Sequence, residues 1–97
     1  MNKEQILSLL AGRREDILVR FGVKKLGVFG SAARDDMRSD SDVDILVEFQ
    51  DTATFDKYMD LKAYLEALLG TTVDLVTEEA LKPRMRPLIE KDMVRVA

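Results

Sequence analysis

One stretch of eight residues, Asp42 to Phe49, limits the possible folds of this chain more than any other feature. Apolar residues occupy every second position in it, at Val43, Ile45, Val47 and Phe49. Because successive side chains of a strand point to opposite faces of a sheet, this alternation predicts a strand with one buried face. Such a strand needs neighbouring strands and a covering layer, so we expect a sheet packed against helices.

The rest of the chain supplies those neighbours in regular alternation. Helical spacing of apolar residues predicts helices over residues 3–21, 31–36, 55–69 and from 78 onward. Short apolar runs predict strands over residues 26–29, 43–49, 72–76 and 93–96. Gly22 and Gly70 suit the position that follows a helix, and Thr77 is a candidate N-cap. We therefore predict an α+β, two-layer fold with a mixed sheet, formed by a single domain over residues 1–97.

Composition restricts the chemistry that the chain can perform. There is no cysteine and no histidine, so a metal site must use oxygen ligands and a general base must be a carboxylate, Lys or Tyr. The net charge of −3 argues against tight direct binding of nucleic acid by this domain alone. No apolar run is long enough to span a bilayer, and the N-terminus lacks the apolar stretch of a signal peptide. We expect a cytoplasmic protein without a membrane partner.

A glycine–serine pair, Gly30-Ser31, lies between a predicted strand and a predicted short helix. Glycine allows a ligand to approach the backbone closely, and the start of a helix offers free N–H groups and positive potential. The Ser31 hydroxyl can add a hydrogen bond. The pair is a candidate phosphate-binding turn, although glycine at a strand-to-helix turn is also a common structural feature.

The acidic sequence Ser41-Asp42-Val43-Asp44 opens the strand described first. Side chains at positions i and i+2 of a strand share a face, so Asp42 and Asp44 are directed to one spot. Two close carboxylates repel each other, and a divalent cation removes that repulsion. Oxygen ligands favour Mg²⁺ or Mn²⁺. The competing interpretation of this sequence is a solvated acidic loop that leads into a strand.

A third aspartate, Asp74, lies within the apolar run Thr72 to Val76. A carboxylate inside a short apolar strand is unfavourable both by strand propensity and by burial. A position beside Asp42 and Asp44 on a neighbouring strand would account for it. The competing interpretation is a charge that protects an edge strand from aggregation.

Together these residues predict phosphoryl transfer assisted by two metal ions. Asp42 and Asp44 are the candidate ligands of both ions, and Asp74 is the candidate ligand of one ion and the group that orients or deprotonates an acceptor hydroxyl. All three are therefore candidate catalytic and metal-binding residues. The candidate nucleotide-binding residues are Gly30, Ser31, Arg34 and Ser41. An EF-hand is excluded because Ile45 replaces the required glycine, and neither a P-loop nor a G-x-G-x-x-G motif is present.

These segments resemble the DNA polymerase β-like nucleotidyltransferase superfamily, and the short chain resembles its minimal nucleotidyltransferase branch. The resemblance rests on residues 26–34, 41–47 and 73–76 and covers about residues 26–96. It implies that the Gly-Ser turn binds triphosphate, that the D-x-D pair binds two Mg²⁺ ions, with Mn²⁺ possible, and that the third aspartate completes the site. ATP is the implied substrate. One departure from the family is Asp35, where many members have glycine after the arginine.

The resemblance also implies a partner and a biological role. Minimal nucleotidyltransferases are often antitoxins paired with a HEPN ribonuclease toxin, and some attach AMP to a tyrosine of that toxin. We therefore expect an active antitoxin that modifies its partner. Two alternatives remain: a binding module that neutralises the toxin by complex formation alone, and a transferase acting on a small molecule or oligonucleotide. Tyr58 and Met59 lie at the border of the apolar stripe on helix 55–69, so one of them is a candidate for contact with a partner. The competing interpretation is that all these residues pack on the sheet.

Overall fold

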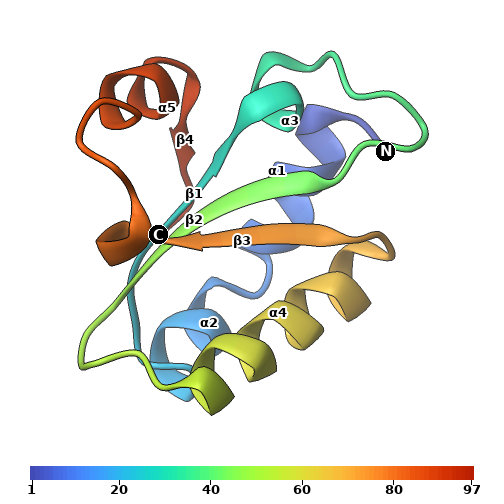
Figure 1. Ribbon diagram of the computed structural model, residues 1–97. Coiled ribbons are helices and arrows are strands. Elements are labelled where there is room, and N and C mark those ends of the chain that lie inside the picture. Colours follow the sequence, from blue (N-terminus) through green and yellow to red (C-terminus); the bar gives the residue numbers. More distant parts are fainter.

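Four strands form one mixed sheet in the order β3-β2-β1-β4. The computed structural model, which describes residues 1–97, confirms the predicted fold class (Figure 1). Strand β2 pairs antiparallel with β1 and parallel with β3, and the short strand β4 pairs antiparallel with β1. The strands are β1 (Val23–Phe29), β2 (Val43–Phe49), β3 (Val73–Thr77) and β4 (Val94–Arg95).

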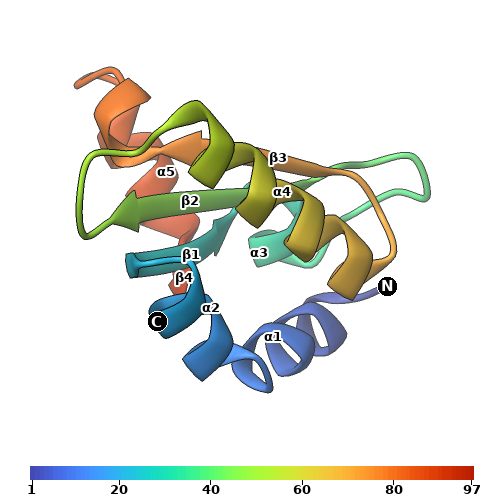
Figure 2. The same cartoon turned by 90° about the horizontal axis from the view of Figure 1, so that it is seen from below.

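Six helical segments surround this sheet. They are α1 (Lys3–Ala11), α2 (Arg14–Arg20), α3 (Gly30–Arg34), α4 (Phe55–Leu69), the 3₁₀ helix η1 (Glu78–Ala80) and α5 (Arg86–Asp92). Figure 2 shows α1 and α2 together on one side of the sheet, away from α5. None of the helices has both the length and the apolar character required to cross a bilayer.

Strand β2 is the centre of the core, and its alternation is confirmed. Val43, Ile45 and Val47 are fully buried and pack with residues of α1, α2 and α4. Leu46 is also buried, but it lies outside that core cluster, on the opposite face of the sheet. The sheet is therefore covered on both faces at its middle, and its polar positions remain accessible near the start of β2.

The predicted helix over residues 3–21 is wrong in one respect, because the chain forms two helices there. Helix α1 ends at Gly12, and the Arg13 N–H donates to the carbonyl of Leu10, three residues earlier, at 3.1 Å. Glycine has low helix propensity and favours such a break. The break allows Leu10 of α1 and Ile17 of α2 each to reach the same core from differently directed helices.

The predicted C-terminal helix from residue 78 is also divided. Thr77 does cap a helical turn, because its hydroxyl accepts a hydrogen bond from the Ala80 N–H at 3.3 Å, but that turn is the 3₁₀ helix η1. Proline lacks the N–H that a helix interior requires, so Pro83 interrupts the pattern. Pro87 lies in the first turn of α5, where no N–H partner is needed.

Helix α4 has the predicted bounds and ends at Gly70, whose φ is 69°. It lies along the free edge of β3 and satisfies two of that strand's backbone groups. The Tyr58 hydroxyl donates to the Leu75 carbonyl at 2.6 Å, and the Glu66 carboxylate accepts from the Val73 N–H at 3.0 Å. Met59 is the exposed member of the pair considered for partner contact. Its contact with a partner remains a prediction.

Candidate active site

The register between β2 and β3 pairs Asp44 with Asp74. Because aligned residues of parallel strands share a face, both carboxylates lie on the face of the sheet opposite the main core. Asp44 is half-buried, and Asp74 is exposed. The structure therefore brings these two predicted site residues together, as the favoured interpretation of Asp74 predicted.

Asp42 lies one residue before β2 and is exposed. The Thr72 hydroxyl donates a hydrogen bond to its carboxylate, and the Thr72 carbonyl accepts from the Val43 N–H at 3.0 Å. Thr72 thus fixes the third carboxylate at the junction of the two strands. This role of Thr72 was not predicted from the sequence. Its only signal is a hydroxyl residue two positions before Asp74.

The electrostatics of the cluster are most evident at Asp44. Burial, followed by the negative charges of Asp74 and Asp42 and a hydrogen bond with Asp74, raises the pKa of Asp44 to about 6. The positive charge of Arg34 opposes this shift. The ionised form of Asp44 is thus disfavoured by the like charges beside it, and a bound cation would remove that repulsion.

The donor set of the cluster is carboxylate oxygen alone, which fits Mg²⁺ or Mn²⁺ by type. Asp44 and Asp74 already face each other across the two strands, whereas the Asp42 carboxylate is engaged by Thr72. No group of three or more acidic, histidine or cysteine side chains is arranged as a complete metal site. A three-carboxylate site would therefore require the exposed Asp42 side chain to turn from Thr72.

Gly30 begins α3 beside the carboxylate cluster, since its neighbour Phe29 pairs with Asp44 across β1 and β2. Its φ is 69°, a left-handed conformation that favours glycine. A Cβ at this position would overlap a carboxylate oxygen of Asp44 and lie 3.1 Å from Asp44 Cγ. The predicted phosphate-binding turn and the predicted metal ligands are thus direct neighbours, with no room for a side chain between them.

We expect Gly30→Ala to lose at least about tenfold in affinity for an ATP analogue, because the new methyl group displaces Asp44 and fills the space next to the turn. Isothermal titration calorimetry measures the affinity, and circular dichroism verifies that the variant is folded. Gly70→Ala is the matched control, since Gly70 has the same φ of 69° but no atom within 4 Å of its Cβ position. Equal affinity of wild type and a folded Gly30→Ala would contradict the assignment.

Arg34 lies one helical turn beyond Gly30, and its guanidinium is held by two carboxylates. It is 3.4 Å from Asp36 and 3.3 Å from Asp92 at the end of α5. These two hydrogen bonds raise the pKa of Arg34. In this structure the Arg34 side chain connects α3 to α5. Its positive charge still acts on Asp44, where it opposes the rise in pKa.

The other two positions that the sequence singled out near this turn have local partners. The Ser41 hydroxyl accepts a hydrogen bond from the Arg38 N–H at 3.0 Å and closes the turn that precedes Asp42. Asp35 has a φ of 59° and is the one non-glycine residue with positive φ. Its carboxylate accepts from the Lys3 N–H at 2.9 Å and so ties the end of α3 to the start of α1. The aspartate thus holds a left-handed position that suits glycine and adds a tertiary contact there.

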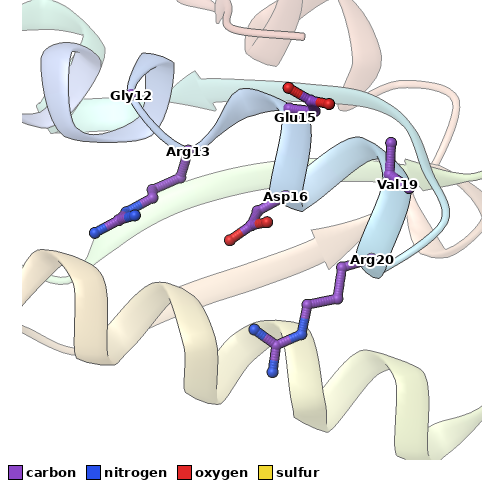
Figure 3. Close-up of a pocket in the computed structure, with 6 residues that line it drawn as sticks. All are labelled: Gly12, Arg13, Glu15, Asp16, Val19 and Arg20. Atoms are coloured by element: carbon purple, nitrogen blue, oxygen red, sulfur yellow. The ribbon is translucent and has the colours of Figure 1, made fainter.

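A separate cavity of about 350 Å³ lies along α2, and Figure 3 shows the side chains around it. Its lining residues are Gly12, Arg13, Glu15, Asp16, Val19 and Arg20. None of the carboxylates of the cluster described above borders it. Arg20 at its rim lies over the rings of Phe21 and Tyr64, with its guanidinium carbon 5.2 and 5.7 Å from their centroids. The cavity carries no arrangement that would support phosphoryl transfer.

Comparisons with known proteins identify the family to which the chain is similar. Residues 6–96 match the sequence profile of the nucleotidyltransferase domain. The chain is 43% identical over 93 residues to the protein adenylyltransferase MntA of Thermococcus cleftensis, covering 96% of this chain and 94% of that protein. A solved structure described as a candidate minimal nucleotidyltransferase is 37% identical, with a TM-score of 0.83 and coverage of 97% and 95%.

A more distant solved structure shares the fold. It is a tri-AMPylated Shewanella oneidensis HEPN toxin in complex with MNT antitoxin, and one of its chains matches with a TM-score of 0.68 at 19% identity. The match covers 94% of this chain and 71% of that one. At this identity the likeness concerns the fold alone.

Proposed function

The chain belongs to the nucleotidyltransferase domain family, and we propose that it transfers AMP from ATP to a hydroxyl group of a protein acceptor. The observation that carries this proposal is the contact of Gly30 with Asp44, which itself pairs with Asp74. A triphosphate-binding turn and a carboxylate cluster then lie side by side. The likeness to MntA of Thermococcus cleftensis, a protein adenylyltransferase, supports AMP as the transferred group.

The proposed roles combine the sequence motifs with the position of Gly30 beside Asp44. The backbone of Gly30 and the hydroxyl of Ser31 bind the triphosphate, together with Arg34 and Ser41. The acceptor oxygen attacks the α-phosphorus, the bond from that phosphorus to the bridging oxygen breaks, and pyrophosphate leaves with the electron pair. Asp74 is the exposed carboxylate of the facing pair, so it takes the proton of the acceptor hydroxyl.

Asp42, Asp44 and Asp74 would hold two Mg²⁺ ions, and Mn²⁺ could take the place of Mg²⁺. The cation supplies stabilisation of the charge that develops on the transferring phosphoryl group and lowers the pKa of the acceptor hydroxyl. The half-buried Asp44 supplies the charge closest to Gly30. The chain's own contribution is to hold these carboxylates beside the turn at a fixed register of two parallel strands.

We further propose that the acceptor is a tyrosine of a HEPN ribonuclease toxin and that the chain acts in the cytoplasm as the antitoxin. The description of the Shewanella complex, an AMPylated HEPN toxin with an MNT antitoxin, supports this acceptor class. The alternative is neutralisation by complex formation without catalysis. The cluster favours catalysis, because a pure binding module gains nothing from a carboxyl group whose pKa is raised by burial and by two neighbouring carboxylates.

The test is transfer of labelled AMP from ATP to the HEPN-domain protein of the same genome, with Mg²⁺ present. We expect the label on a tyrosine of that protein, located by mass spectrometry, and no label with the variant Asp42→Asn/Asp44→Asn. Calorimetry with Mn²⁺ and a non-hydrolysable ATP analogue should show binding by the wild type alone. Unlabelled partner with the wild type, or metal binding unaffected in the double variant, would contradict the proposal.

A further inference from the structure

Helix α5 covers the same face of the sheet that carries the carboxylate cluster. Gly27 of β1 pairs with Leu46, which lies two residues beyond Asp44 and therefore on the same face. The Met93 side chain, at the end of α5, lies directly on Gly27, since a Cβ there would be 2.8 Å from the Met93 sulfur. The end of α5 therefore lies on the same face of the sheet as Asp44 and Asp74.

One flank of α5 leads toward the active site. Residues three and four apart on a helix are neighbours, so Met85, Leu88 and Asp92 follow one another along this flank. Asp92 pairs with Arg34, the arginine whose charge acts on Asp44. Met85 and Leu88 are 42% and 64% exposed. Two large apolar side chains are thus exposed on the flank of α5 that ends beside the active site.

The segment that precedes this flank is basic within an acidic protein. Residues 81–88 contain three basic residues and no acidic one, whereas the chain as a whole has a net charge of −3. Arg86 already forms ion pairs, because its guanidinium is 2.7 Å from the Glu78 carboxylate and 3.5 Å from the Glu90 carboxylate. Lys82 and Arg84 are exposed and form no ion pair. We call Lys82, Arg84, Met85 and Leu88 the α5 ledge.

We propose that the α5 ledge is the docking surface for the protein acceptor, through an acceptor segment that carries carboxylates next to an exposed apolar side chain. The inference rests on the proposed function, since it names the surface by which the acceptor reaches the same site. Two unpaired cations complement carboxylates, and Leu88 and Met85 supply the apolar contact that interface centres require. The apolar pair and the acidic net charge favour a protein over a nucleic acid as the occupant.

The test compares Lys82→Glu/Arg84→Glu with Arg13→Glu/Arg14→Glu, a control with the same change of charge on α2, beside the cavity of Figure 3. Binding of the HEPN-domain protein is measured by biolayer interferometry, and AMP transfer is measured against its concentration. We expect the ledge variant to raise both Kd and apparent KM by at least about tenfold, with kcat within about threefold of wild type. Affinity for the ATP analogue should stay unchanged. Leu88→Ala, which alters no charge, should raise both constants severalfold.

Several outcomes would contradict the proposal that the α5 ledge is the docking surface. They are wild-type binding by the ledge variant, equal losses in both double variants, or loss of kcat without loss of affinity. Tighter binding of a labelled single-stranded RNA by the wild type than by the ledge variant, with acceptor binding unchanged, would assign the surface to nucleic acid instead. Binding without transfer by the wild type would refute the proposed function, while the ledge would still be judged by the binding constants. Absence of binding by the wild type would refute both.

Discussion

Asp74→Asn is expected to reduce the rate of AMP transfer by about 10²- to 10⁴-fold while leaving binding of the acceptor protein and of the ATP analogue within about tenfold of wild type. The reason is the position of the side chain. Asp74 faces Asp44 across the parallel pair β2–β3 but is exposed, so it is the carboxylate that an incoming hydroxyl meets first. Asparagine keeps its size and removes the charge that accepts the proton.

The distribution of the loss between rate and affinity identifies the role of Asp74. An interaction made in the transition state alone lowers kcat, whereas one made with bound substrate raises KM. The surface proposed to bind the acceptor lies on α5, so the substitution should not weaken docking. Labelled AMP transfer measures the rate, and biolayer interferometry measures the affinity for the partner.

Asp40→Asn is the matched control for this measurement. Asp40 is an exposed carboxylate in the same loop region, two residues from Asp42, and takes part in no ion pair. The Asp40→Asn variant should transfer AMP at the wild-type rate. Full protection of cells from the toxin by Asp74→Asn would show that complex formation is sufficient and would refute a catalytic mechanism. A variant that binds the toxin but fails to protect would support catalysis.

The sequence was most informative where local pattern and tertiary structure agree. The alternation in β2 predicted its bounds, and the i, i+2 rule placed Asp42 and Asp44 at one end of it. Helix α4 was predicted with its final glycine because an apolar stripe and the glycine that follows it mark the same segment, and the structure adds an N-cap at Thr54. The pairing of Asp44 with Asp74 was inferred as the explanation for a charge within an apolar strand, and the register of β2 and β3 bears it out.

The features that the sequence could not supply depend on contacts between distant segments. A helical pattern continues across Gly12, and only the folded structure shows that α1 and α2 are separate helices that both pack on the core. The contact of Thr72 with Asp42, 30 residues apart, leaves no periodic signal. The pairing of Arg34 with Asp92 requires α5 to fold back onto α3, which no local pattern indicates, and the contact of Arg34 with phosphate stays a prediction. Strand β1 begins three residues before the predicted start, at Val23, because it continues beside the full length of β2.

Asp44→Asn is expected to stabilise the protein in the absence of metal at pH 7 by about 1–2 kcal/mol, even though it removes a proposed metal ligand. The folded protein raises the pKa of Asp44 from 3.8 to about 6, first through burial and then through the charges of Asp74 and Asp42. Ionising this group therefore costs more in the folded state than in the unfolded state. A shift of this size corresponds to at most about 3 kcal/mol, and the partial exposure of the side chain reduces the effect.

The same shift determines how stability depends on pH. Between about pH 4 and pH 6 the folded state binds more protons at Asp44 than the unfolded state does, so the free energy of unfolding falls as pH rises through this window. Asparagine does not titrate and removes that fall. The variant should therefore exceed wild type at pH 7 and match it near pH 4. Thermal unfolding at the two pH values, without metal, should show a Tm difference of about 4–16 °C at pH 7 alone.

Metal and nucleotide should reverse this order of stability. A ligand that binds only the folded state raises its stability, so Mn²⁺ with the ATP analogue should increase the Tm of wild type. Asp44→Asn has lost a ligand to that cation and should show little increase, while Asp40→Asn should respond as wild type does. A variant that is less stable than wild type at pH 7 without metal would refute the electrostatic account of Asp44. A variant that gains as much Tm from Mn²⁺ and nucleotide as wild type would instead remove Asp44 from the metal site, because the carboxyl group whose pKa is raised to about 6 would then not be one that a cation binds.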